Sequence, residues 1–278
     1  MISSRIDVPP EAVASHYDDL DHFYRDVWGE HVHHGLWLRG NETRDEAVLQ
    51  LVDRVAERVR VVDCMRICDI GCGYGATARA LAQRGAEVTG ITISPAQFGI
   101  ATQQADRNPQ FVCGDWTENN FASGSFDAAI AIESSEHMAD KAAFFAQAHR
   151  VLRAGGRLVI CAWLAAEHPS ARAQRWLLEP ICREGRMPQL GSESDYRELG
   201  VAAGFAPEQF EDVTRRVERT WPAIVRRLLV KFATSPRYLK FLFSPHENNR
   251  VFALTILRIW LAYRTNSMRY GVFTFVKS

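Results

Sequence analysis

The stretch ICDIGCGYGATA at residues 67–78 joins a short apolar run to three glycines and an alanine-rich segment. The apolar run ends at Asp69, and Gly71, Gly73 and Gly75 follow at alternate positions. Glycine permits backbone conformations that are closed to other residues, and it leaves no Cβ between the backbone and a ligand. The first turn of a helix presents unpaired N–H groups that suit a carboxylate or a phosphate. We therefore predict a strand, a tight turn and a helix that together bind a ligand.

Strand and helix patterns alternate on both sides of this stretch. Further strands are expected at 87–93, 111–115, 126–133, 157–163, 210–217 and 270–277, and helices at 43–55, 77–84, 140–153, 192–204 and 220–264. Such alternation predicts an α/β fold, with a doubly wound, mostly parallel sheet of seven strands and helices on both faces. Ligands of these sheets bind beyond the carboxyl ends of the strands. There we expect Asp69, Thr92, Asp115 and Glu133 along one edge.

The same patterns divide the chain into four parts. Residues 1–42 are expected to form an N-terminal helical cap segment, 43–218 an α/β core, 219–267 a helical lid insertion and 268–278 the last core strand. The lid is predicted because a helical insertion of this length exceeds what a connection before the final strand requires. Aromatic residues run through it, among them Trp260 and Tyr263, and together they indicate contact with an apolar substrate.

Charge is balanced over the whole chain but unevenly distributed. The 33 Lys and Arg equal the 33 Asp and Glu, so nothing predicts binding to nucleic acid. Residues 215–277, however, hold 13 Lys and Arg against 2 acids. This basic quarter is a solvated helical face by default; attraction of an anionic substrate or a membrane surface is the alternative.

Cysteines and apolar runs indicate where the protein resides. The spacing of the six cysteines matches no zinc signature, and residues 1–11 contain no apolar signal-peptide core. No apolar stretch is long enough to span a bilayer before a charge interrupts it. We expect free thiols, a cytoplasmic location and no transmembrane segment. The oligomeric state is open, with a homodimer among the alternatives.

Three histidines, His31, His33 and His34, lie in an aromatic segment near the N-terminus. A metal site is one interpretation, but adjacent histidines rarely face one ion and no third ligand type lies at a useful spacing. We predict no metal, and assign this segment to packing or to contact with a small ligand, with His34 as a candidate substrate contact.

Several motifs carry a resemblance to a known family. The D-x-G-x-G-x-G form at residues 69–75 resembles motif I of class I S-adenosylmethionine (SAM) methyltransferases, and differs from the G-x-G-x-x-G of nicotinamide-binding folds. The segments WGEHVHHG at 28–35, GITISPAQ at 90–97, IESSEHMADK at 132–141 and MRYG at 268–271 are similar to those of the γ-tocopherol methyltransferase-like group. The resemblance covers residues 15–277 and implies a Rossmann-like methyltransferase fold.

The resemblance implies SAM as the cofactor and assigns residues to its parts. Asp69 and the carbonyl of Gly71 would accept from the methionine ammonium, with Gly73 in the same turn and Tyr17 near the carboxylate. The remaining candidates are Thr92 and Gln97 at the ribose, Ile93 and Trp116 around adenine, Asp115 at the exocyclic amine, and Glu133.

The acceptor implied by this group is a lipophilic small molecule, methylated on a hydroxyl or a phenol. A base is needed for such an acceptor, and His137 is the best candidate because an ordinary histidine titrates near neutrality; Glu133 and Glu136 are alternatives. Two other hypotheses stay open. One is C-methylation of a prenyl chain or prenyl diphosphate, and the other is a SAM-binding cyclase or scaffold that transfers no methyl group.

Overall fold

A computed structural model describes residues 1–235 and 247–278, with side chains from residue 255 onward in the second range. Seven strands form the main sheet in the order β4-β3-β2-β5-β6-β9-β8. Its neighbours pair in parallel except for β9, which runs antiparallel to both β6 and β8. The predicted fold class, a mostly parallel seven-stranded α/β sheet, is confirmed.

The bounds of the elements follow the chain. The main strands are β2 (Arg66–Ile70), β3 (Glu87–Thr92), β4 (Gln110–Cys113), β5 (Phe126–Ile132), β6 (Leu152–Ala165), β8 (Phe205–Asp212) and β9 (Met268–Lys277), and β1 (Ile2–Ser3) pairs separately with β7 (Gln189–Leu190). The longer helices are α1 (Pro10–Asp19), α2 (Asp21–Trp28), α3 (Arg44–Val59), α4 (Ala76–Ala82), α5 (Pro95–Gln103), α6 (Lys141–Val151), α9 (Glu193–Ala202), α11 (Thr220–Thr234) and α13 (Glu247–Arg264). Shorter turns are η1 (Trp116–Glu118), η2 (Ser135–His137), α7 (Ala171–Ala173), the π-helical η3 (Gln174–Leu178), α8 (Glu179–Glu184) and α10 (Thr214–Val217).

Side chains alternate across the sheet and fill two cores. In β5, Ala128 and Ile130 join a core that includes Leu51 of α3. Ala129, on the opposite face, joins a second core that includes Phe144 of α6. Successive side chains of a strand point to opposite faces, so both faces of this sheet need cover. Helices α3 and α4 cover one face, and α6 and α9 cover the other.

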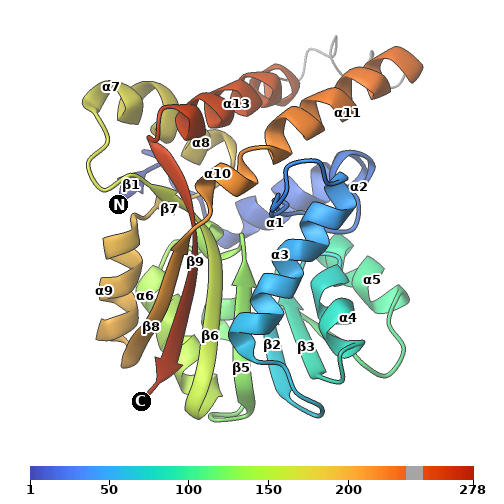
Figure 1. The fold of residues 1–278 in the computed structure, drawn as a ribbon, viewed down its shortest axis with the longest axis vertical. Helices are drawn as coiled ribbons and strands as arrows, with labels where there is room; N and C mark the ends of the chain where they lie inside the picture. The colour runs from blue at the N-terminus through green and yellow to red at the C-terminus, as the bar shows by residue number, and fades with distance from the viewer. Residues whose placement is uncertain (236–246) are drawn as a thin grey trace.

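The remaining helices gather beyond the carboxyl ends of the parallel strands. Figure 1 shows α7, α8, α11 and α13 at the top of the molecule, with α1 and α2 beneath them at the strand ends. The N-terminal segment is held there by Asp18 of α1, whose Oδ1 accepts from the Ser94 hydroxyl at the start of α5. This edge of the sheet is therefore covered on two sides, by the N-terminal helices and by α11 and α13.

Three predicted boundaries are wrong. The strand expected at 210–217 is β8 at 205–212, and α10 follows because Asp212 accepts from the backbone N–H and the hydroxyl of Thr214. The helix expected to end at 153 ends at Val151, and the chain enters β6 before its two glycines. The helix expected over 220–264 is described as α11 and α13, and the part at 236–246 lies outside the described residues. The predicted bounds of cap, core and lid stay a prediction. Within the described ranges, no helix is long and apolar enough to cross a membrane.

Candidate functional site

The glycine turn after β2 forms one wall of a cavity at the carboxyl edge of the sheet. The cavity has a volume of about 240 Å³. Gly71 and Gly73 have φ of +74° and +55°, in the left-handed region that favours glycine. A Cβ on Gly71 would lie 2.3 Å from the Cβ of Ser134, whereas a Cβ on Gly73 would meet no atom within 4 Å. Gly71 is thus required by packing, and Gly73 opens its backbone to the cavity.

All ten residues expected to bind the cofactor line this cavity: Tyr17, Asp69, Gly71, Gly73, Thr92, Ile93, Gln97, Asp115, Trp116 and Glu133. Asp69 has an unpartnered buried carboxylate oxygen, Oδ2, among the described residues. Burial raises the pKa of Asp69 to about 7. A buried acceptor without a donor suits an ammonium group, and the open space at Gly73 suits a ligand against the backbone. These features fit the amino-acid part of SAM.

The opposite end of the cavity combines polar side chains with an aromatic face. The Thr92 hydroxyl donates to Gln97 Oε1 over 2.9 Å, and both side chains are buried. Trp116 is buried and donates through Nε1 to the carbonyl of Phe144 over 3.2 Å, which fixes its ring. Asp115 caps η1 through Oδ1, which accepts from the N–H and the hydroxyl of Thr117. Hydroxyl and amide groups beside a held indole suit a ribose and a purine.

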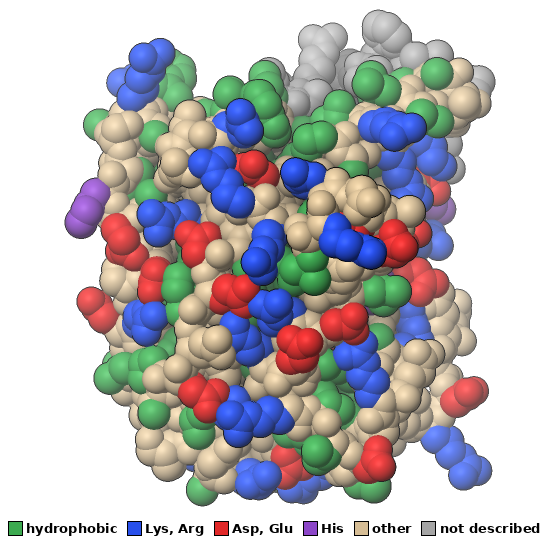
Figure 2. Space-filling view, in the orientation of Figure 1, with side chains coloured by type: hydrophobic (Ala, Val, Ile, Leu, Met, Phe, Trp, Pro, Cys, Tyr) green, Lys and Arg blue, Asp and Glu red, His purple; other side chains and the backbone are tan. Residues whose placement is uncertain are grey.

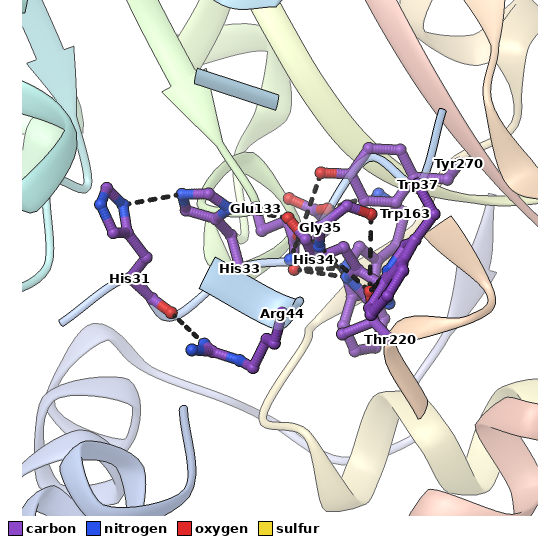
Figure 3. Close-up of polar contacts among 11 residues, drawn as sticks. His31, His33, His34, Gly35, Trp37, Arg44, Glu133, Trp163, Thr220 and Tyr270 are labelled. Atoms are coloured by element: carbon purple, nitrogen blue, oxygen red, sulfur yellow. Dashed lines mark hydrogen bonds and ion pairs between the residues drawn. The ribbon is translucent and has the colours of Figure 1, made fainter. Parts of the chain in front are cut away.

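Glu133, at the end of β5, is the centre of a buried network (Figure 3). Its carboxylate accepts from the backbone N–H of His34 at 2.7 Å, from His34 Nδ1 at 3.0 Å, from Trp163 Nε1 at 2.8 Å and from the Tyr270 hydroxyl at 2.7 Å. Burial raises its pKa, but His34 outweighs burial and the net pKa is lowered to about 2. Its φ of +52° is a strained conformation for glutamate. The geometry therefore favours Glu133 as an anchor between the N-terminal segment and the sheet, rather than as a base.

A second, smaller cavity of about 100 Å³ lies beside the first. The two share Tyr17, Val32, Glu133 and His137 in their walls. Indole and aliphatic side chains dominate the rest of the second cavity: Trp28, Trp163, Ile181, Met187, Trp221, Ile256 and Ile259. Its polar lining consists of His16, Tyr24, Glu136, Glu184 and Thr255. An apolar cavity with few polar groups, adjoining the cofactor cavity, has the character of an acceptor site.

His137 and Tyr17 form a hydrogen-bonded pair in the shared wall. Nδ1 of His137 lies 3.2 Å from the carbonyl of Arg186, and a carbonyl only accepts, so Nδ1 carries the proton. Nε2 is then an acceptor and receives the Tyr17 hydroxyl, 2.9 Å away. Burial lowers the pKa of His137 to about 4, and burial raises the pKa of Tyr17. The expectation of a titration near neutrality is wrong, because the ring is desolvated.

Three predicted substrate contacts lie outside both cavities. His34 and Tyr263 are fully buried in the core, and His34 is held by Glu133. Trp260 lies on the outer face of α13 and is 38% exposed. The residues of α13 that do line the second cavity are Thr255, Ile256 and Ile259. The substrate role expected for His34, Trp260 and Tyr263 therefore has no support in the geometry.

The N-terminal histidines are bonded to one another. His31 Nδ1 lies 3.1 Å from His33 Nε2, and His33 Nδ1 donates to the carbonyl of His34 (Figure 3). Burial lowers the pKa of His31 to about 3. Over residues 1–235 and 255–278, whose side chains the structure describes, no group of three or more metal-ligating side chains is suitably arranged for an ion.

Sequence reasoning missed two residues that support the second cavity, Arg186 behind His137 and Glu184 in the lining. Arg186 orients His137 through a backbone carbonyl, which no side-chain motif can indicate. Glu184 accepts from the Thr255 hydroxyl at 2.6 Å and pairs with Arg258, so it fastens α13 to α8 at the cavity. Its buried charge pair joins two segments far apart in the sequence, and neither segment carries a recognisable pattern.

Comparisons with known proteins agree with this geometry. Residues 68–160 match the model of a methyltransferase domain. The chain is 33% identical to the 27-O-demethylrifamycin SV methyltransferase of Amycolatopsis mediterranei, over 78% of this chain and 82% of that protein. It is 28% identical to the chloroplastic tocopherol O-methyltransferase of Arabidopsis thaliana, over 95% of this chain and 81% of the relative. Among solved structures, the 4+2 cyclase SpnF superposes with a TM-score of 0.83 at 25% identity, over 98% of this chain and 99% of that one.

Proposed function

Because this chain belongs to the class I SAM-dependent methyltransferases and methylates small molecules, we propose that its acceptor is a neutral, lipophilic molecule methylated on a hydroxyl oxygen. The observation that carries the proposal is the second cavity. Its apolar walls meet the cofactor cavity at the Tyr17–His137 pair. The rifamycin and tocopherol relatives are named for O-methylation, which supports the same choice and favours a role in secondary metabolism.

Three parts of SAM have candidate partners in the lining of the cofactor cavity. We assign the methionine ammonium to Asp69 and the Gly71 carbonyl, the ribose to Thr92 and Gln97, and adenine to the space between Ile93 and Trp116. Asp115 lines the same cavity, and we assign it to the exocyclic amine of adenine. When bound, SAM supplies an electrophilic methyl group on a sulfonium sulfur. The protein then has to place an oxygen in line with that methyl group and to exclude water.

The Tyr17–His137 pair provides the route for the acceptor proton. The Tyr17 hydroxyl donates to His137 Nε2, so its oxygen keeps lone pairs that can accept from an acceptor hydroxyl. As the acceptor oxygen gains the methyl group, its proton passes to the Tyr17 oxygen and the Tyr17 proton passes to Nε2. The carbonyl of Arg186 holds Nδ1–H throughout. Because the pKa of His137 is lowered to about 4, its ring is neutral at physiological pH and can accept a proton.

Charge in the second cavity weighs against a diphosphate acceptor. A diphosphate leaving water normally needs arginine or lysine forks, or a metal ion. No lysine or arginine is found among the described residues that line either cavity, while Glu136 and Glu184 line the second. The basic residues of the C-terminal quarter whose side chains are described therefore line neither cavity. A neutral acceptor is favoured over a prenyl diphosphate.

The test is a panel of neutral lipophilic phenols and alcohols, amines and prenyl diphosphates, each assayed with labelled SAM across a salt titration. The proposal expects turnover of hydroxyl acceptors with weak salt dependence. Turnover of a prenyl diphosphate alone, with strong salt sensitivity, would replace it by C-methylation. Binding of SAM with no conversion to S-adenosylhomocysteine would favour the cyclase or scaffold hypothesis.

A cytoplasmic location and a homodimer stay predictions, to be checked by cell fractionation and by size-exclusion chromatography.

A further inference from the structure

The outer surface of the lid helices exposes large apolar side chains. Leu229 on α11 is 63% exposed, Leu257 on α13 is 52% exposed, and Trp176 in η3, which packs beside α13, is 62% exposed. Val225, Val230 and Trp260 on the same helices are also exposed. Scattered single apolar residues on a surface are normal, but a concentration of them on adjoining elements marks an interaction site. We call these six residues the lid face.

Charge has a single sign among the side chains that the structure describes on these elements. The segments 171–178, 220–234 and 255–264 contain no Asp or Glu, and their cations are Arg172, Arg175, Arg226, Arg227, Lys231, Arg258 and Arg264. Two guanidinium groups lie over exposed indoles, Arg175 at 5.4 Å from the Trp176 ring centre and Arg264 at 6.0 Å from that of Trp260. Figure 2 shows hydrophobic and basic side chains together along the upper edge, where Figure 1 places α11 and α13.

Helix α13 has apolar residues on two faces. Ile256 and Ile259 close the second cavity, while Leu257 and Trp260, three residues apart on one face, point away from it. Tryptophan with flanking arginine is the combination found where a helix lies in the headgroup region of a bilayer.

We propose that the lid face docks on a membrane surface containing anionic lipids. Arg172, Arg175, Arg226 and Arg227 pair with lipid phosphates and the exposed Trp and Leu side chains enter the headgroup region, so the acceptor cavity, which the opposite face of α13 lines, lies one helix away from the lipid phase. A lipophilic acceptor dissolved in that bilayer then reaches the cavity without crossing water. The docking proposal rests on the neutral lipophilic acceptor proposed above, but its main test measures binding to vesicles and not turnover.

The experiment is flotation of the full-length protein with vesicles of phosphatidylcholine alone or mixed with phosphatidylglycerol. We expect binding to the anionic vesicles only, and release as salt rises, because charges at a surface are screened within about 10 Å at 0.1 M salt. Replacing Trp176, Leu229 and Leu257 together by serine should weaken binding on the order of 100-fold, since half-exposed side chains lose their transfer into lipid. Arg172→Glu with Arg175→Glu should weaken it at least about 30-fold.

Matched control variants test whether vesicle binding depends on the lid face or on any exposed apolar or basic side chain. Val62, Val112 and Val201 are 63%, 39% and 56% exposed on other elements, and their serine variant should bind vesicles like the wild type. Arg60→Glu with Arg107→Glu is the charge control. Equal binding to both vesicle types, no binding at all, or equal loss in the control variants would overturn the proposal. So would a wild-type dimer that the lid-face serine variant dissociates, because a second copy would then cover this face.

The methylation rate gives a second readout, because the acceptor can be supplied either in detergent or in vesicles. With an acceptor dispersed in detergent, the lid-face serine variant should keep the wild-type rate; with the acceptor embedded in anionic vesicles, it should lose most of it. A chain that floats with vesicles but methylates no hydroxyl would retain the docking proposal and refute the proposed function. If the wild type and the lid-face serine variant methylate a hydroxyl acceptor equally fast in detergent and in vesicles, the proposed function is retained and the docking proposal is refuted.

Discussion

Gly73 offers the sharpest separation of cofactor binding from folding. A side chain there would meet no protein atom within 4 Å, so it would project into the cavity assigned to SAM. Gly155, in β6, has φ of +72° and the same open surroundings, but it does not line either cavity. Valine at either position costs about 1–2 kcal/mol of left-handed backbone strain. Both variants should therefore melt about 2–8 °C lower than the wild type.

Only the Gly73→Val variant should lose SAM affinity. Forcing a side chain into occupied space costs about 1–3 kcal/mol, which corresponds to about a 5- to 160-fold weaker Kd. Calorimetric titration with SAM on the two folded variants measures the difference, and Gly155→Val should retain the wild-type Kd. Equal affinity of the Gly73 and Gly155 variants would refute the placement of SAM against this turn. Gly71→Val is a poorer probe, because its side chain would collide with Ser134 and unfold the turn.

Three further predictions follow from the shared wall and the lid. His137→Ala should lower kcat about 10²–10⁴-fold with nearly unchanged SAM affinity in calorimetry, and Tyr17→Phe should also lower kcat; wild-type turnover in either would remove that residue from the proton route. Burial lowers the pKa of His16 and His137 to about 4, below the unfolded value of 6.5, so for these groups the unfolded state binds more protons between the two values and their contribution to stability should fall as pH drops from 6.5 to 4, by up to about 1.4 kcal/mol per pH unit for each histidine. Burial raises the pKa of Asp69 to about 7, which acts in the opposite sense, so the contribution is measured as the difference in urea unfolding between the wild type and His16→Ala; the same pH slope in both would contradict it. Glu184→Gln should raise the KM for the acceptor about tenfold or more and leave the Kd for SAM unchanged, because it weakens the charge pair between the buried Glu184 and the half-buried Arg258; Glu193→Gln, at a pair with Arg197 that lines neither cavity, is the control and should change neither.

The cofactor cavity could be predicted from sequence because its residues follow local rules. Asp69, Thr92 and Glu133 each end or directly follow a buried parallel strand, and such ends converge on one edge of the sheet. The glycine turn adds a backbone requirement that is visible in the sequence itself. All of these positions lie in the part of the chain where strands and helices alternate regularly.

The acceptor cavity could not be predicted in the same way. Its walls come from α1, α2, α8, α11 and α13, and the rotation of each helix is set by packing against distant segments. Trp260 and Ile259 are adjacent in sequence, yet one lies outside and the other lines the cavity. The aromatic content of the lid indicated an apolar environment without saying which residues face inward. The low pKa of His137 likewise depends on burial that only the assembled fold reveals.

Transfer of a methyl group to an acceptor oxygen can be followed directly with labelled cofactor. The purified protein is incubated with SAM labelled with ¹³C in the methyl group and with a neutral lipophilic phenol, and the product is examined by NMR and mass spectrometry. We expect one labelled methyl ether and one S-adenosylhomocysteine for each acceptor consumed, with both yields falling together in His137→Ala. Label on carbon, or product formed with no S-adenosylhomocysteine, would contradict it.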